Sequence, residues 1–241
     1  MEYQEEFATD EPRKTGLDLD SELVENIDAL AAAGERGMVL NILSDLHHAD
    51  IAQIINHIED DNARTVLNWL PVELAGELLT ELDDDYRADL LETTPDSKLA
   101  AMLDELDTDD AADVLLDLPS EVQERILPEL VDAADVQELI GYEEESAGGI
   151  MATEFVAIRE DRTVAQATEV VRENAETVEE IYMVFVVDED EKLTGLVSLK
   201  RLLLSGAHQR LSEIMDRDFV SVQTDVDQED VARLVERYDL V

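Results

Sequence analysis

The sequence predicts a multidomain protein of the α plus α/β class, in which a short-helix, superhelical α-solenoid precedes a part with β-α-β-β-α order. Apolar residues recur every twelve positions in the first half, and runs typical of β-strands begin after residue 150. The 241 residues, 45% of them apolar, suffice for packed cores and for more than one domain. The absence of cysteine excludes disulfides, thiolate metal sites and cysteine nucleophiles.

Acidic residues dominate the charge, because 62 Asp and Glu oppose only 17 Lys and Arg and give a net charge of −45. This balance argues against nucleic acid or anionic lipid as partners, since both bind basic surfaces. It fits a halophile-like protein in a very salty cytoplasm, where 1 M salt screens charges within about 3 Å. The acidic N-terminus lacks the apolar stretch of a signal peptide, and no apolar run reaches the ~20 residues of a membrane span. We therefore expect a cytoplasmic location.

A helical repeat occupies the first half of the chain. Residues 1–18 are expected to form a disordered acidic tail, and a first helix is predicted over 21–33, ending at Gly34. Twelve-residue spacing then sets in, and a proline, expected at the first helical position, follows every second repeat position. Short helices at a fixed period stack into a solenoid, because none can bury its apolar stripe alone. The repeat positions are Ile58, Leu70, Leu82, Leu106, Leu118 and Leu130, with Thr94 in the missing place and Pro71, Pro95 and Pro119 as the prolines.

One amphipathic helix is predicted over residues 106–118, with Thr108 as its N-cap. Asp109, Asp113 and Asp117 are spaced by four, which places their carboxylates on one face. An oxygen-rich face of this kind suits a hard cation such as Mg²⁺. A solvated acidic face is the alternative interpretation, and the spacing alone does not decide between the two. The core-facing side would carry Ala111, Ala112, Leu115 and Leu118.

An acidic segment with a Gly-Gly pair is predicted to be a hinge, and the α/β part follows it. Strands are expected at 155–158, 182–187 and 193–199, with a helix over 164–174 between the first two and another helix from Lys200. A second round would place a strand at 219–222 and a helix over 228–238. The predicted divisions are 1–18 (tail), 19–140 (helical repeat domain), 141–150 (hinge), 151–210 (first α/β unit) and 211–241 (truncated second unit).

Two motifs carry a resemblance to known families. The β-α-β-β-α unit, with Ile150-Met151 before its first strand and residues 195–198 closing its hairpin, resembles a CBS domain, and residues from 213 onward resemble a second CBS unit cut off midway. The helical repeat with residues 106–113, followed by residues 145–151, resembles the cytosolic part of MgtE-type magnesium transporters.

The resemblance implies a Mg²⁺-sensing gate, in which the helical domain and the CBS units close around bound Mg²⁺ and hold a membrane pore shut. It further implies a homodimer through the CBS units and a membrane pore domain as partner. Facing carboxylates repel one another, and a divalent ion with oxygen ligands reverses the sign of that interaction. By motif match, the implied Mg²⁺ ligands are Glu77, Asp109, Asp113, the carbonyl of Gly149 and Asp239.

The sequence departs from the family pattern at two places. CBS units that bind adenine nucleotides commonly carry an acid three residues after the Ser or Thr of the third strand, and here that position is Arg201, after Ser198. An arginine can contact a phosphate, but the acid that would hold the ribose is absent there. The second CBS unit also lacks its later strands and no pore helices follow, so we expect a fragment or the product of a split gene.

Other functions stay open at this point. A free-standing nucleotide-responsive CBS regulator and a solenoid scaffold for protein partners both fit the predicted elements. No phosphate-loop motif and no spacing typical of a catalytic triad occurs, so we expect no enzymatic activity.

Overall fold

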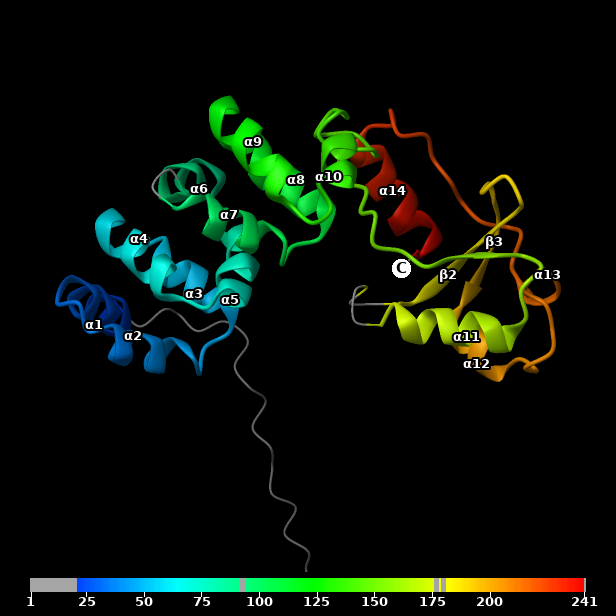
Figure 1. The fold of residues 1–241 in the computed structure, drawn as a ribbon, viewed down its shortest axis with the longest axis horizontal. Coiled ribbons are helices and arrows are strands. Elements are labelled where there is room, and N and C mark those ends of the chain that lie inside the picture. Colours follow the sequence, from blue (N-terminus) through cyan, green and yellow to red (C-terminus); the bar gives the residue numbers. More distant parts are fainter. Residues whose placement is uncertain (1–20, 92–93, 176–177, 179–180, 241) are drawn as a thin grey trace, which may run out of the picture. The chain divides into compact units, whose positions relative to one another are not determined.

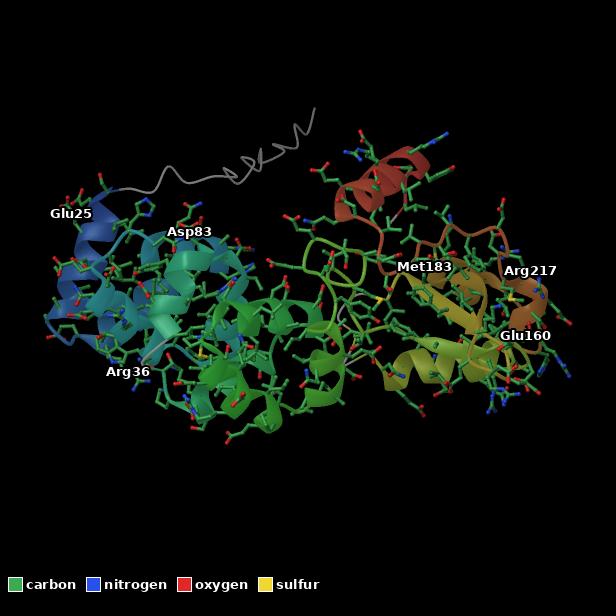
Figure 2. All side chains as sticks on the ribbon, turned by 90° about the horizontal axis from the view of Figure 1, so that it is seen from above. Glu25, Arg36, Asp83, Glu160, Met183 and Arg217 are labelled. Carbon is green, nitrogen blue, oxygen red and sulfur yellow. The ribbon has the colours of Figure 1, made fainter. Side chains whose placement is uncertain are left out.

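The computed structural model describes residues 21–91, 94–175, 178 and 181–240 (Figure 1). The predicted tail over 1–18 lies outside these described residues. The chain divides into two compact units, Met1–Lys98 and Leu99–Val241, and each is described by itself. Figure 2 shows oxygen-tipped side chains on both units, and the labelled acids Glu25, Asp83 and Glu160 are among them. None of the described helices is both long and apolar enough to cross a membrane.

The first unit is built from short helices, as the twelve-residue period predicts. Helix α1 packs against α2 and α4, and α4 in turn packs against α6. The repeat positions Ile58, Leu70 and Leu82 are buried, so the period marks the core positions of a solenoid. The elements are α1 (Ser21–Ala32), α2 (Arg36–Leu43), α3 (His48–Ile55), α4 (Asp60–Trp69), α5 (Val72–Glu77), the 3₁₀ helix η1 (Leu79–Glu81), α6 (Asp84–Leu91) and α7 (Asp96–Leu103), which continues into the second unit.

The prolines lie one residue earlier than predicted. Pro71 and Pro119 are N-caps with extended ψ angles of 151° and 139°, and α7 begins directly after Pro95. The prediction of proline at the first helical position was therefore wrong by one residue. At the N-cap the proline carbonyl accepts the first helical hydrogen bond, for example from the Ala75 N–H at 2.9 Å. Its missing N–H costs nothing at either position.

Two of the few basic side chains cap the C-terminal end of α4. Lys98 Nζ donates to the Leu67 carbonyl at 2.9 Å, and Arg36 Nη2 donates to the Trp69 carbonyl at 3.2 Å. Cations are favourable at a helix C-terminus, where the last carbonyls have no helical partner. Burial, and then the nearby Arg36 charge, lower the pKa of Lys98 below the usual lysine value.

The lowered pKa of Lys98 predicts a pH effect on stability. Between the folded and unfolded pKa values the unfolded chain binds more protons, so stability should rise with pH across that alkaline window. We expect this rise to be smaller in Lys98→Met, measured by urea unfolding of both proteins over an alkaline pH series. Lys192→Met, at an exposed turn, is the control. Equal pH slopes in the wild type and Lys98→Met would contradict the assignment.

The second unit begins with the rest of the helical repeat. Helices α8 (Thr108–Asp117), α9 (Ser120–Ile126), η2 (Leu127–Glu129) and α10 (Ala133–Leu139) follow α7, and α8 packs against both α9 and α10. The predicted core face of α8 is confirmed, because Ala111, Ala112, Leu115 and Leu118 are all buried. The predicted N-cap was wrong: Asp107 is the N-cap and Thr108 is the first helical residue. The Thr108 side chain has other hydrogen-bond partners, described below.

The predicted β-α-β-β-α order is confirmed in the rest of the second unit. Strand β1 pairs parallel to β2, and β2 pairs antiparallel to β3, in the sheet order β1-β2-β3. Helices α11 and α12 pack against each other, and Val184, Val186 and Val197 of the sheet join them in one apolar core. The elements are β1 (Ala157–Arg159), α11 (Val164–Glu173), β2 (Met183–Val187), β3 (Leu193–Ser198), α12 (Leu199–Leu204), α13 (Leu211–Ile214) and α14 (Gln228–Tyr238).

The second round forms only in part. Helix α14 is present as predicted, but the strand expected at 219–222 is not formed. A strand needs a neighbour for its N–H and C=O groups, and among the described residues this segment has none. Figure 1 shows α14 at the end of the red segment, and none of its side chains is fully buried.

The predicted hinge is joined to the segment before α14 by backbone hydrogen bonds. Ala147 N–H donates to the Val226 carbonyl at 2.7 Å, and Gly148 N–H donates to the Thr224 carbonyl at 2.9 Å. In return, Gln228 N–H donates to the Glu145 carbonyl at 2.9 Å. We call residues 145–148 with 224–228 the hinge clasp. It holds the chain between α10 and β1 in a defined conformation.

Candidate functional site

The predicted acidic face of α8 is present. Asp109 and Asp113 lie one helical turn apart and are both half-buried, while the opposite face of α8 is packed in the core. Their only donor atoms are carboxylate oxygens, which fit a hard cation such as Mg²⁺ and not a soft transition metal. The chemistry of this pair therefore suits the ion that the sequence predicts.

The other predicted ligands come from separate elements. Glu77 is the exposed last residue of α5 in the first unit. Gly149 is buried beside the hinge clasp, and Asp239 ends α14 in the left-handed conformation with φ of 51°. Across the described residues, no three or more His, Asp or Glu side chains are grouped so that they could hold a metal ion. The five-residue ligand set therefore stays a prediction.

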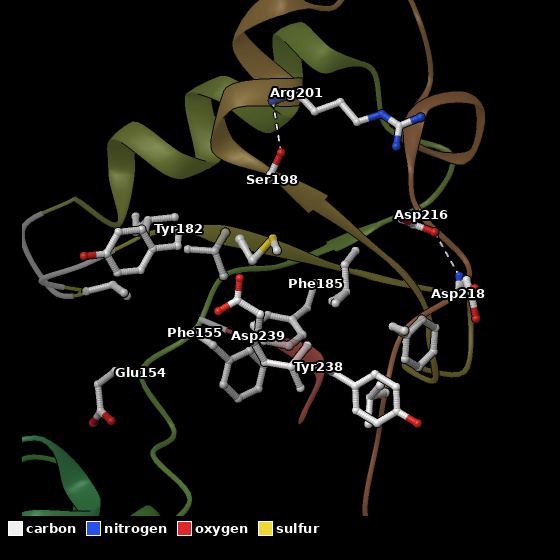
Figure 3. A pocket seen from close by; sticks show the side chains of 18 residues that line it. Glu154, Phe155, Tyr182, Phe185, Ser198, Arg201, Asp216, Asp218, Tyr238 and Asp239 are labelled. Atoms are coloured by element: carbon white, nitrogen blue, oxygen red, sulfur yellow. Dashed lines mark hydrogen bonds between the residues drawn. The ribbon is translucent and has the colours of Figure 1, made fainter. Parts of the chain in front are cut away.

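A pocket of about 800 Å³ opens beside the sheet, between β2, β3, the segment before β1 and the end of α14 (Figure 3). Aromatic rings dominate one wall, and Phe155 meets Phe185 edge to face with ring centroids 5.4 Å apart. Such rings can hold a flat apolar or aromatic group. The aromatic lining residues are Phe155, Tyr182, Phe185, Phe219 and Tyr238.

Polar groups lie at the border of the pocket. Arg201 is exposed there, and its backbone N–H donates to Ser198 Oγ at 3.2 Å, which caps α12. The position where an acid was expected thus carries a guanidinium, which suits a phosphate. Carboxylates reach the pocket from elsewhere in the chain, and Asp239 is one of them (Figure 3). The acidic lining residues are Glu154, Asp216, Asp218 and Asp239.

Sequence reasoning missed a contact between α8 and the segment before β1. The Thr108 N–H and hydroxyl group lie 3.1 Å from the two carboxylate oxygens of Glu154. The Thr108 hydroxyl also lies 2.9 Å from Thr153 Oγ1. The residues are more than forty positions apart, and no local pattern in the sequence indicates such a pairing.

Two known domain families match this sequence, one in the helical repeat and one in the α/β part. The MgtE intracellular N domain matches residues 46–145, and the CBS domain matches residues 147–207. The cytosolic domain of the Mg²⁺ channel MgtE, solved in complex with ATP, superposes with a TM-score of 0.82. It is 34% identical in sequence, and the match covers 90% of this chain and 89% of that one. The chain belongs to the MgtE family. This confirms the predicted fold class and the resemblance.

Other MgtE relatives agree with this assignment. The soluble part of a magnesium transporter has a TM-score of 0.75 at 29% identity, covering 91% of this chain and 87% of that one. Magnesium transporter MgtE of Thermus thermophilus is 35% identical over 226 residues, which are 92% of this chain and 50% of the relative. The Enterococcus faecalis transporter of the same name is 39% identical over 110 residues, 46% of this chain and 24% of the relative. The chain thus spans about half the length of the Thermus transporter, and it matches the region that is cytosolic in the MgtE channel.

Proposed function

We propose that this chain is the cytosolic Mg²⁺-sensing and gating region of a magnesium transporter or channel. The observation that carries the proposal is the match over nine-tenths of the chain to an MgtE cytosolic domain, together with the acid pair on α8. In this role, Mg²⁺ binds between the helical domain and the CBS unit and locks the closed state of a pore domain. A homodimer through the CBS units belongs to the same proposal.

The charge of the chain supplies the physical basis of the gate. With a net charge of −45, two acidic surfaces brought together without cations repel each other. Asp109 and Asp113 on α8, with Glu77, the Gly149 carbonyl and Asp239, are the groups that would hold the ion. A ligand that binds only the closed arrangement shifts the population toward it by its differential affinity. Mg²⁺ concentration thereby sets how often the domains are closed.

Small-angle scattering in molar KCl tests the gate. We expect Mg²⁺ to reduce the radius of gyration and excess EDTA to restore it, whereas further KCl has no effect. Because molar salt already screens long-range repulsion, only direct coordination can produce the Mg²⁺ response. A radius of gyration that is indifferent to Mg²⁺ would contradict the proposal, and a stable partner complex under those conditions would favour the scaffold alternative.

A nucleotide is a second candidate ligand, favoured by the aromatic pocket of about 800 Å³ and by the ATP in the similar MgtE domain. We infer that the base would lie on the rings and that Arg201 would meet a phosphate. A hydrogen bond to a charged group contributes about 1.5–3 kcal/mol, so Arg201→Gln should weaken ATP binding at least tenfold in calorimetry. Arg217→Gln, an exposed arginine outside the pocket lining, is the matched control. Equal affinities of Arg201→Gln and the wild type would contradict this role of Arg201.

A further inference from the structure

The start of α8 is fixed to the segment before β1 by a closed set of hydrogen bonds. Thr108 N–H lies 3.1 Å from Glu154 Oε1, and Thr108 Oγ1 lies 3.1 Å from Glu154 Oε2. Thr153 N–H donates to Thr108 Oγ1 at 3.2 Å, and the two threonine hydroxyls are 2.9 Å apart. We call these three residues the α8 latch.

The donors in the α8 latch can be assigned from chemistry alone. An ionised carboxylate only accepts, so the Thr108 hydroxyl must donate its single proton to Glu154. The Thr153 hydroxyl must then donate to Thr108, whose oxygen accepts from both the N–H and the hydroxyl of Thr153. The Thr108 hydroxyl thus makes one donated and two accepted bonds, which is its full capacity. Since Thr108 is only 3% exposed, water cannot readily replace a lost partner.

The start of α8 attracts the negative charge of Glu154 through its backbone N–H groups and repels it through its acidic side chains. The first N–H groups of a helix have no helical partner and attract a carboxylate. The first turn of α8 already carries Asp109 and Asp110, preceded by Asp107, and these charges repel Glu154. The N–H and hydroxyl groups of Thr108 thus hold the Glu154 carboxylate at a helix end that already carries acids.

Glu154 also belongs to the pocket beside the sheet, where the next residue, Phe155, packs against Phe185. Figure 3 shows the Glu154 carboxylate directed away from the ring of Phe155. Phe155 is 53% exposed and lines the pocket, so a ligand there would contact it directly. A shift of Phe155 would move the adjacent Glu154 and with it the contact to α8.

We propose that Glu154 is a positioning residue that transmits occupancy of the pocket to α8, the helix that carries Asp109 and Asp113. The inference deepens the proposed function and rests on it, since it needs a ligand in the pocket. It assigns the coupling between pocket and acid pair to one side chain. The coupling works by holding or releasing the first turn of α8.

Hydrogen exchange of the α8 amides, with and without saturating ATP and in the absence of Mg²⁺, tests the latch. In the wild type we expect ATP to change the exchange rate of the first-turn amides by roughly tenfold, the effect of one hydrogen bond to a charged group. In Glu154→Gln this ratio should fall toward one, because the uncharged amide offers one acceptor oxygen in place of two and binds the Thr108 N–H more weakly than a charged carboxylate does. Calorimetry on each variant sets the ATP concentration needed for saturation.

Controls separate the coupling from a merely structural role. A structural role would speed exchange equally with and without ATP and leave the ratio unchanged. Glu173→Gln, an exposed charge loss at the end of α11, should keep the wild-type ratio. In Thr108→Val the ratio of exchange rates with and without ATP should fall to one, whereas Thr108→Ser should keep the wild-type ratio because serine retains the hydroxyl. This pair of variants tests the latch even if Glu154→Gln fails to fold.

The outcomes also separate this proposal from the ones it rests on. A wild-type ratio in Glu154→Gln, or a wild type that binds ATP with no change in α8 exchange, would overturn the coupling alone. Absence of ATP binding in calorimetry would overturn the pocket assignment together with the coupling. Neither result bears on the Mg²⁺ response in scattering, which tests the gate.

Discussion

Replacing Asp109 and Asp113 together by asparagine is expected to move the Mg²⁺-induced compaction of this chain in molar KCl to much higher Mg²⁺ concentrations. Asparagine keeps the shape of each side chain and removes its charge. Each lost charged ligand should weaken binding by about 1.5–3 kcal/mol, so the Mg²⁺ midpoint should rise by two orders of magnitude or more. Small-angle scattering over a Mg²⁺ series measures that midpoint.

The stability of the same double variant is measured by urea unfolding without Mg²⁺, so that a loss of compaction can be told from a loss of folding. The matched control is Glu124→Gln with Glu138→Gln, two exposed acids on α9 and α10, which makes the same change in net charge. If the double Asp variant compacts at the same Mg²⁺ concentration as the wild type, α8 does not take part in Mg²⁺ sensing.

A comparison at low salt distinguishes direct coordination of Mg²⁺ from general charge screening. Without molar KCl, a chain of net charge −45 should contract in response to any added cation, and the Asp variants should contract nearly as well. A response shared by Na⁺ and Mg²⁺ is general screening, whereas a response confined to Mg²⁺ in molar KCl is coordination.

The helical repeat could be predicted because its information is local. Each buried position is marked by its own residue type at a fixed spacing, and even Thr94, in the missing place, is buried. The core face of α8 follows from the same periodicity, because a helix turns through a fixed angle at each residue. The order of strands and helices in the CBS unit was readable for the same reason.

The pocket and the α8 latch could not be predicted, because they depend on contacts between distant residues. Thr108 looked like an N-cap, since threonine before acidic residues usually has that role. Asp107 is the N-cap instead, and the N–H and hydroxyl of Thr108 hydrogen-bond to the carboxylate of Glu154, 46 positions later. The strand predicted at 219–222 failed for a related reason, because local β-propensity needs a partner strand to act on.

Gly149→Ala is expected to destabilise the second unit strongly. A Cβ at this position would lie 2.5 Å from the Glu144 carbonyl oxygen and 2.6 Å from that of Glu143. Both obstacles are backbone atoms, and the adjacent hinge clasp restricts their movement through its three hydrogen bonds to residues 224–228. Overpacking of this kind costs about 1–3 kcal/mol, occasionally more, and thermal unfolding should show a loss of several degrees.

Gly37→Ala is the control, because a Cβ at Gly37 in α2 meets no atom within 4 Å and alanine favours a helix by about 1 kcal/mol over glycine. Its melting temperature should stay level or rise. If Gly149→Ala has the same melting temperature as the wild type, the hinge clasp adjusts to the added Cβ without loss of stability, and the segment between α10 and β1 is a flexible hinge. If it is destabilised as expected, the carbonyl of Gly149 is held in one place by the fold, which is the property required of a backbone ligand in the proposed gate.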